Sequence, residues 1–126
     1  MLNNKTILIT GGAGSFGKAF VEFVQKKYRP KKIIIFSRDE YKHYEFQKEL
    51  IKKKLIKNIR FFIGDVRDLD RLKIAFKGVD YIIHAAALKH VEVAEYNPQE
   101  FIKTNITGAQ NIIDASIERG VKKVIA

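Results

Sequence analysis

The sequence contains no cysteine, which excludes disulfide bonds and thiolate metal sites and fits a cytoplasmic protein. It also has no run of eighteen apolar residues and no segment resembling the apolar core of a secretion signal. Neither a membrane partner nor export is therefore expected. Internal repeats, linkers and low-complexity segments are missing as well, so the 126 residues are expected to form one globular domain.

Acidic residues are the scarcer charge, with 14 Asp and Glu against 24 Lys and Arg and a formal net charge of +10. Such an excess raises the question of a nucleic-acid partner. The basic clusters (residues 26–32, 52–57 and 122–123) each fall at the end of an expected helix or in the turn after it. Cations there complement the negative end of a helix dipole, on the side of a parallel sheet opposite its ligand crevice. Solvated helix ends are therefore predicted, without a nucleic-acid partner.

Glycines gather near the start of the chain, in residues 7–17 (ILITGGAGSFG). An apolar strand runs into the glycines, and the glycines run into a helical pattern. Two spacings fit, Gly12-x-Gly14-x-x-Gly17 and Gly11-x-x-Gly14-x-x-Gly17. We expect Gly12 and Gly14 to make a sharp turn that approaches a pyrophosphate, and Gly17 to bring the helix close to the strand. The strand before and the helix after favour a dinucleotide site over a structural turn.

Apolar periodicity predicts alternating strands and helices along the rest of the chain. Strands are expected at residues 6–10, 33–36, 59–63, 79–84 and 121–126, and helices from about 15 to Pro30, 39–54, 68–78 and from Asn97-Pro98 to Gly120. Right-handed crossovers then give an α/β fold, a Rossmann-like doubly wound parallel sheet of strand order 3-2-1-4-5. Because such cofactor enzymes need further chain on the substrate side, residues 1–126 are expected to be a dinucleotide-binding domain truncated after strand five.

The end of the second strand bears on the choice of cofactor. Ser37 and Arg38 follow the glycines by about twenty residues, where an acidic residue would bind the ribose of NAD and an arginine the extra phosphate of NADP. Both side chains can donate to a phosphate, and Lys42 lies one helical turn beyond Arg38. Asp39 and Glu40 leave NAD open, although Asp39 is better placed as a helix cap. NADP is favoured, with a plain surface charge as the alternative for Arg38.

Two further positions follow the third and fourth strands. Asp65 can accept a hydrogen bond from an adenine amine and Val66 can cover the ring, although Asp65 can equally be a turn residue. Asp68 is a helix cap. Lys89 follows an alanine-rich turn next to the expected nicotinamide ribose, where a cation can hold ribose, phosphate or sugar hydroxyls, and a loop lysine without a specific role is the equal alternative.

Metal and acid–base chemistry find little support in the residues present. His84 and His90 have no second histidine or carboxylate at ligand spacing, so no metal site is predicted. Tyr28/Lys32 and Tyr44/Lys48 match the Tyr-x-x-x-Lys pattern of an acid–base pair. Neither is interpreted as catalytic, because the first pair spans Pro30 at the wrong end of the sheet and the second lies far from a nicotinamide.

Six stretches together carry a family resemblance: TGGAGSFG (10–17), FSRDE (36–40), FFIGDVRD (61–68), HAAALKH (84–90), AEYNP (94–98) and KTN (103–105). The chain resembles the extended short-chain dehydrogenase/reductases, and more narrowly the inverting UDP-N-acetylglucosamine 4,6-dehydratases. The first stretch is shared by many reductases, whereas FSRDE with HAAALKH carries the narrower resemblance.

The resemblance implies a set of cofactor residues, and it implies that Lys89 touches the nucleotide sugar as well. With the glycine motif included, the expected NADP contacts are Gly11, Gly12, Ala13, Gly14, Ser15, Phe16, Gly17, Ser37, Arg38, Asp39, Glu40, Tyr41, Lys42, Asp65, Val66, Ala85, Lys89 and Thr104. A UDP-sugar substrate and a homo-oligomeric full-length protein are implied too.

The implied reaction uses NADP+ as a returning hydride carrier. Hydride leaves C4 of the sugar, the C5 proton is removed, water departs from C6, and the hydride returns to C6 with inversion at C5. The family's catalytic Ser-Thr-Asp-Lys and Tyr-x-x-x-Lys stretches follow the fifth strand, so catalytic residues are expected beyond Ala126 and residues 1–126 alone are expected to be inactive. A stand-alone dinucleotide-binding or regulatory module and a part of another sugar-nucleotide epimerase or reductase remain the alternatives.

Overall fold

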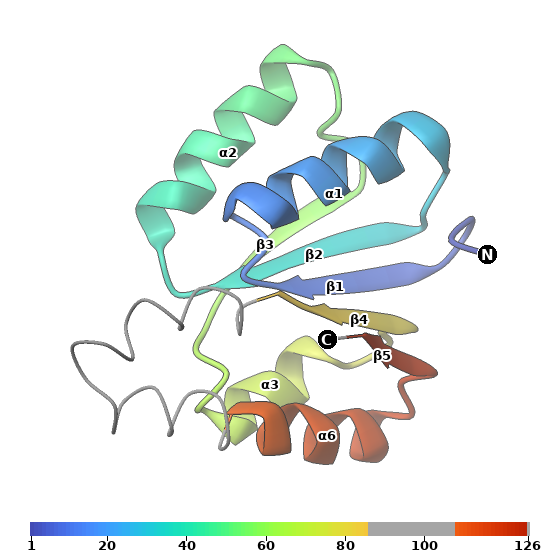
Figure 1. Cartoon of the computed structure of the whole chain (residues 1–126), viewed down its shortest axis with the longest axis vertical. Helices are drawn as coiled ribbons and strands as arrows, with labels where there is room; N and C mark the ends of the chain where they lie inside the picture. Colours follow the sequence, from blue (N-terminus) through green and yellow to red (C-terminus); the bar gives the residue numbers. More distant parts are fainter. Residues whose placement is uncertain (86–107, 126) are drawn as a thin grey trace.

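A computed structural model describes residues 1–85 and 108–125 of the chain. Their core is a five-stranded parallel sheet of order β3-β2-β1-β4-β5 (Figure 1), which confirms the predicted fold class. The strands are β1 (Thr6–Thr10), β2 (Lys32–Ser37), β3 (Ile59–Ile63), β4 (Tyr81–His84) and β5 (Lys123–Ile125). The helices are α1 (Ser15–Lys27), α2 (Glu40–Lys52), α3 (Leu69–Ala75) and α6 (Gly108–Arg119).

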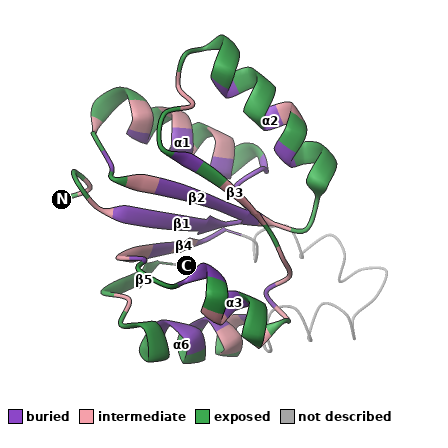
Figure 2. Ribbon diagram, turned by 180° about the vertical axis from the view of Figure 1, so that it is seen from behind, coloured by how far each residue is buried: buried purple, intermediate pink, exposed green. Residues whose placement is uncertain are grey.

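The two central strands alternate their side chains between two apolar layers, as parallel strands covered on both faces do. Leu8 and Ile34 belong to a cluster that includes residues of α3 and α6. Ile7 and Ile33, which face each other in the β1–β2 register, belong to a second cluster with α1 and α2. Figure 2 shows the resulting buried band along β1 and β2 between the two helical layers.

Helix starts follow the side chains that the sequence offers. Asp39 accepts a hydrogen bond from the backbone N–H of Lys42 at 3.1 Å, and Asp68 accepts one from that of Arg71 at 3.1 Å. Both residues are N-caps, as predicted. Lys26 and Lys27 lie in the last turn of α1, and Lys52 lies in that of α2, so these cations do sit at helix carboxyl ends.

Some predicted boundaries were wrong. The fourth strand begins at Tyr81 rather than at Val79, because the Val79 N–H bonds to the Phe76 carbonyl in the turn after α3. α1 ends at Lys27, before Pro30, and the fifth strand is confined to residues 123–125. The expected helix start at Asn97-Pro98 lies outside the described residues.

Two negative findings apply to residues 1–85 and 108–125. None of their helices is long and apolar enough to cross a membrane. In the same two stretches, no group of three or more His, Asp or Glu side chains could hold a metal ion.

Candidate dinucleotide site

The carboxyl ends of β1, β2, β3 and β4 meet at one edge of the sheet, where the glycine loop follows β1 (Figure 1). The loop turns at Gly11, whose φ of 70° lies in the left-handed region that favours glycine. The Gly11 N–H donates to the carbonyl of Phe36 at 2.8 Å, which ties the turn to β2. The Gly14 N–H donates to the Gly11 carbonyl at 3.1 Å, so residues 11–14 form the predicted sharp turn, with Gly12 inside it and Gly14 closing it at φ −83° and ψ 178°.

Gly12 and Gly17 are needed for close approach. A Cβ on Gly17 would lie 2.5 Å from both the Cα and the carbonyl oxygen of Gly12, so only glycine lets α1 rest on this loop. A Cβ on Gly12 would lie 2.9 Å from Cγ2 of Ile35. The predicted close approach of the helix at Gly17 is present, and its neighbour is the backbone of Gly12 in the loop after β1 rather than the strand itself.

The N-terminus of α1 presents positive potential to the loop. Gly14 is the N-cap and makes no side-chain cap bond, and the first turn carries no acidic residue. Its N–H groups and the helix dipole are consequently uncompensated by any side chain of that turn. A hollow of about 280 Å³ opens beside it, lined by Ala13, Gly14, Ser15, Lys18 and Lys42. Two lysines from two different helices thus border the glycine loop, which is suited to an anion.

The end of β2 holds the residues expected to read the cofactor. Arg38 extends into solvent, with 55% of its side chain exposed, and its Nη1 lies 3.7 Å from Oδ2 of Asp65. Ser37 is half-buried, and its Oγ lies 2.6 Å from Nε2 of His43. Asp39 caps α2 through Oδ1, which accepts from the Lys42 N–H. The structure thus brings the ends of β2 and β3 together.

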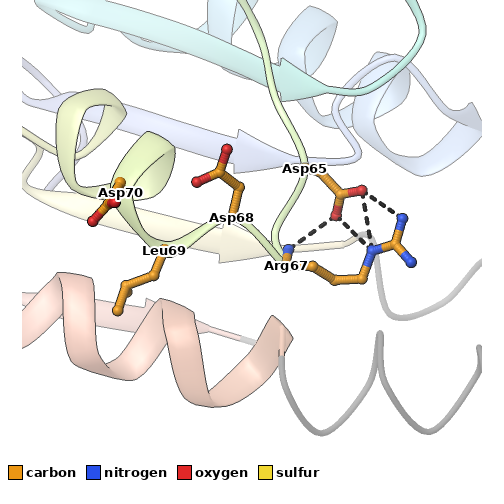
Figure 3. A pocket seen from close by; sticks show the side chains of 5 residues that line it. All are labelled: Asp65, Arg67, Asp68, Leu69 and Asp70. Carbon is orange, nitrogen blue, oxygen red and sulfur yellow. Dashed lines mark hydrogen bonds and ion pairs between the residues drawn. The ribbon is translucent and has the colours of Figure 1, made fainter.

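Asp65 is held by arginine rather than left open. Its Oδ1 accepts from the backbone N–H of Arg67 at 2.9 Å, and its Oδ2 accepts from Arg67 Nη2 at 2.7 Å (Figure 3). Partial burial acts to raise the pKa of the Asp65 carboxyl, but the Arg67 hydrogen bonds and the charges of Arg67 and Arg38 together lower that pKa below its ordinary value. A hollow of about 540 Å³ lies against this turn, bordered also by Asp68, Leu69 and Asp70.

The Asp65–Arg67 pair gives a pH dependence whose sign is fixed by the lowered pKa. A carboxyl with a depressed folded-state pKa stabilises the fold above its unfolded pKa of about 3.9, and that stabilisation is lost as the pH falls through the folded value. Between about pH 5 and pH 3, the wild-type protein is expected to lose more unfolding free energy than the Asp65→Asn variant. Urea unfolding at each pH measures this, with Asp70→Asn at an exposed position as the control. Equal losses in Asp65→Asn and wild type would contradict the assignment.

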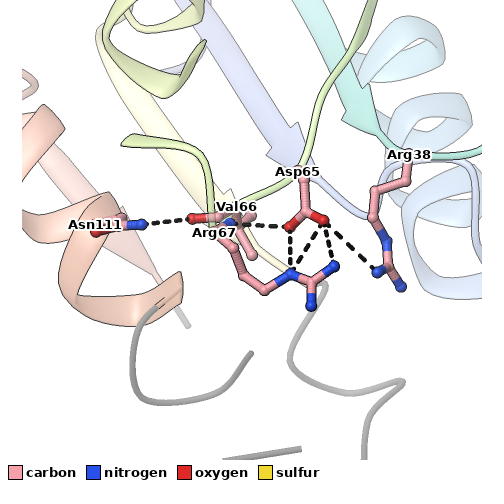
Figure 4. A network of polar contacts seen from close by, with 5 residues as sticks. All are labelled: Arg38, Asp65, Val66, Arg67 and Asn111. Atoms are coloured by element: carbon pink, nitrogen blue, oxygen red, sulfur yellow. Dashed lines mark hydrogen bonds and ion pairs between the residues drawn. The ribbon is translucent and has the colours of Figure 1, made fainter. Parts of the chain in front are cut away.

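Val66 is buried in the apolar cluster that includes residues of α3 and α6, and α6 contacts it directly. Asn111 Nδ2 donates to the Val66 carbonyl at 3.1 Å (Figure 4). A Cβ on Gly108 would lie 2.7 Å from Val66 Cγ2, so the first residue of α6 sits directly against this side chain. The loop after β3 is therefore fastened to α6 by a hydrogen bond and a close apolar contact.

Removing the Asn111 amide tests this anchor. Asn111→Ala leaves the Val66 carbonyl without its side-chain donor, and we expect a loss of about 1 kcal/mol of unfolding free energy. Gln110→Ala is the matched control, because that amide is exposed and bonds within α6 to Asp114. Urea unfolding measures the free energy of unfolding of both variants. Equal stability of Asn111→Ala and wild type would contradict a stabilising role for this hydrogen bond.

The end of β4 completes the described edge. The Ala85 N–H donates to the Thr10 carbonyl at 3.1 Å, and Thr10 Oγ1 lies 2.7 Å from His84 Nδ1, both in buried surroundings. Lys89 and Thr104 lie outside the described residues. The predicted contacts that are described lie at the end of β2, as Ser37 does, or in the loops and helix starts that follow β1, β2, β3 and β4, as do Gly11, Gly12, Ala13, Gly14, Ser15, Phe16, Gly17, Arg38, Asp39, Glu40, Tyr41, Lys42, Asp65, Val66 and Ala85.

Four side chains at this edge were missed by sequence reasoning: Lys18, His43, Arg67 and Asn111. Arg67 carried the one available signal, a basic residue two positions after Asp65. The two Tyr-x-x-x-Lys pairs lie elsewhere. Tyr28 is the C-cap of α1, and Lys48 lies over the ring of the exposed Tyr44 at 5.1 Å on α2.

Comparison with known proteins places this fold and glycine loop in a family. The family described as "Polysaccharide biosynthesis protein" matches residues 7–126. The chain belongs to this family.

Relatives and solved structures show what the chain is similar to. A UDP-N-acetylglucosamine 4,6-dehydratase (inverting) from Campylobacter jejuni is 58% identical over 126 residues, which cover 100% of this chain and 36% of the relative. A UDP-glucose 4-epimerase from Rickettsia akari is 45% identical over 128 residues, covering 99% of this chain and 36% of the relative. The chain therefore spans about a third of the length of these relatives.

A solved structure supports the same arrangement. DesIV, a dTDP-glucose 4,6-dehydratase from Streptomyces venezuelae with NAD and TYD bound, superposes with a TM-score of 0.76 at 27% identity, covering 94% of this chain and 38% of that one. The chain thus shares its Rossmann-type sheet with a sugar-nucleotide dehydratase.

Proposed function

We propose that residues 1–126 form the NADP-binding Rossmann domain of a nucleotide-sugar 4,6-dehydratase. The proposed substrate is UDP-N-acetylglucosamine, and the proposed product is a 4-keto-6-deoxy sugar nucleotide with inversion at C5. The observation that carries the proposal is the glycine loop, where an uncapped helix N-terminus and two lysines border one hollow. The 58% identity to the Campylobacter jejuni dehydratase over the whole chain supports the choice of reaction.

The residues at the sheet edge fit a dinucleotide with an additional phosphate. Backbone N–H groups at the start of α1 can hold the pyrophosphate, with Lys18 and Lys42 beside it. Arg38 directly follows the end of β2 and is exposed. It can donate hydrogen bonds to the 2′-phosphate that distinguishes NADP from NAD. Bound at this edge, NADP+ would supply a reversible hydride acceptor for the sugar carbons C4 and C6.

The remaining assignments belong to the same proposal. Asp65 and Val66 face the adenine, Ala85 and Thr104 contact the cofactor, and Lys89 reaches both cofactor and UDP-sugar. The acid–base residues lie in the part of the protein beyond residue 126. The whole protein is a cytoplasmic homo-oligomer in this proposal.

A second candidate is a sugar-nucleotide epimerase, favoured by the 45% identity to the Rickettsia akari UDP-glucose 4-epimerase. An epimerase also moves hydride at C4, but it returns the hydride to the same carbon. Its product therefore has the mass of its substrate. A dehydratase product is lighter by one water.

The full-length protein that carries this chain decides between them. Incubation with UDP-N-acetylglucosamine and NADP+, followed by mass spectrometry, is expected to show loss of one water from the sugar nucleotide. In D2O, NMR is expected to show deuterium at C5 and an inverted C5 configuration. A product of unchanged mass would support the epimerase, and a folded protein without turnover or cofactor binding would overturn both.

A further inference from the structure

His43 is a buried polar side chain at the edge of the candidate site, and the sequence alone predicts no role for it. It lies in the first turns of α2 and is 5% exposed, with its ring 5.2 Å from that of Phe61 on β3. Its Nε2 lies 2.6 Å from Oγ of Ser37, the last residue of β2. The imidazole is thus fixed between two strands, with one polar contact, and that contact is to a predicted cofactor residue.

The second ring nitrogen indicates where the proton sits. His43 Nδ1 is buried and has no hydrogen-bond partner among the described residues. A buried N–H without an acceptor costs about 1–3 kcal/mol, so a proton on Nδ1 is disfavoured. Placing the proton on Nε2 instead makes Nε2–H the donor and Ser37 Oγ the acceptor.

The ring is neutral near pH 7. Burial lowers the pKa of His43 from its ordinary value of 6.5, and the charge of Asp39 opposes this only in part. The ring lies between the hydroxyl of Ser37 and the apolar ring of Phe61. His43 therefore offers one directed N–H, and no net charge, to the end of β2.

A hydroxyl that accepts from His43 keeps its own hydrogen for another partner. Ser37 is half-buried and adjoins the exposed Arg38, so an O–H donor and a guanidinium lie side by side at one strand end. Both are donors that suit a phosphate oxygen. We propose that His43 is a positioning residue that holds the Ser37 hydroxyl as a hydrogen-bond donor toward the 2′-phosphate of NADP+. This inference rests on the proposed cofactor, and it predicts that His43 affects NADP+ but not NAD+.

Calorimetric titration of the purified protein with NADP+ and NAD+ tests the proposal. His43→Phe keeps an aromatic ring against Phe61 but lacks Nε2–H, and we expect its NADP+ affinity to fall about five- to tenfold with NAD+ affinity unchanged. His43→Gln retains an N–H donor and is expected to bind NADP+ within about twofold of wild type. Adding His43→Phe to Ser37→Ala is expected to weaken NADP+ no further than Ser37→Ala alone, because the two residues act as one unit.

NMR of histidine-labelled protein supplies a readout that packing alone would not move. The chain has three histidines, so loss of one set of signals in His43→Gln assigns the His43 ring. Imidazole nitrogen shifts are expected to show Nε2 protonated, and to change on addition of NADP+ but not of NAD+. A proton on Nδ1 would overturn the proposal, even if the Phe variant fails to fold.

The outcomes separate this inference from the proposed cofactor. Wild type that prefers NADP+, with His43→Phe equal to it, overturns the role of His43 and leaves the cofactor assignment intact. Equal weakening of NADP+ and NAD+ in His43→Phe, without rescue by His43→Gln, assigns the residue to packing only. Wild type without any preference for NADP+ overturns the cofactor assignment, and this inference with it.

Discussion

Alanine in place of Gly17 is expected to weaken dinucleotide binding by more than about tenfold and to destabilise the fold by about 2 kcal/mol. The added Cβ would lie 2.5 Å from the Gly12 backbone, which has no flexible side chain that could move aside. Alanine gains about 1 kcal/mol over glycine in helix propensity, but overpacking against backbone costs about 1–3 kcal/mol or more, so the steric term dominates. α1 must shift, and its N-terminus shifts with it.

Urea unfolding and calorimetric titration with NADP+ and NAD+ measure both effects. Ala19→Ser, at an exposed position of the same helix, is the control and is expected to stay within about 0.5 kcal/mol of wild type. Gly17 matters for both cofactors alike, because the pyrophosphate is common to them. Retained affinity in Gly17→Ala would mean that the dinucleotide does not use the N-terminus of α1.

Arg38→Ala is expected to weaken NADP+ binding about ten- to a hundredfold while NAD+ binding changes less than about twofold. A hydrogen bond between charged groups contributes about 1.5–3 kcal/mol, and only NADP+ carries the 2′-phosphate that Arg38 would meet. The ion pair with Asp65 does not compete strongly, because its atoms lie 3.7 Å apart and the arginine is 55% exposed.

Arg60→Ala is the matched control for this substitution. Arg60 is exposed on β3, and its guanidinium donates to the carbonyl of its own neighbour Ile59 at 3.0 Å. The Arg60→Ala substitution removes the same charge near the start of β3, away from the glycine loop. Equal weakening of NADP+ binding by both substitutions would mean that Arg38 acts only through the net charge of the protein. Unchanged NADP+ affinity in Arg38→Ala would contradict the NADP assignment.

The fold was predictable because each element leaves a local signal. The strand at residues 59–63 and the caps Asp39 and Asp68 lie where the sequence predicts them. Boundaries erred where a turn hydrogen bond competes with strand pairing, as at Val79. The local sequence pattern is sufficient to predict that a strand or a helix start exists. The positions of the side chains in the connecting loops depend on contacts between loops, which the local pattern does not contain.

The site was less predictable because its pairings join distant parts of the chain. Asn111 donates to Val66 across 45 positions of sequence, and no spacing rule connects them. Within the glycine loop, the left-handed conformation falls on Gly11 although Gly12 and Gly14 could also have adopted it. Asp65 was expected to accept from an adenine amine or to be a turn residue, and its pairing with Arg67 is one that only the folded turn reveals.

Hydrogen bonds hold the loop after β3 at two successive residues. The Asp65 carboxylate accepts from Arg67, and the Val66 carbonyl accepts from Asn111 of α6. Each fastening removes backbone freedom at the moment the chain folds, at about 1–2 kcal/mol of conformational entropy per residue. A ligand that reaches this edge afterwards meets a segment that is already ordered. Its contacts there translate into affinity without a further entropic loss for the loop, which is the advantage of a preorganised surface.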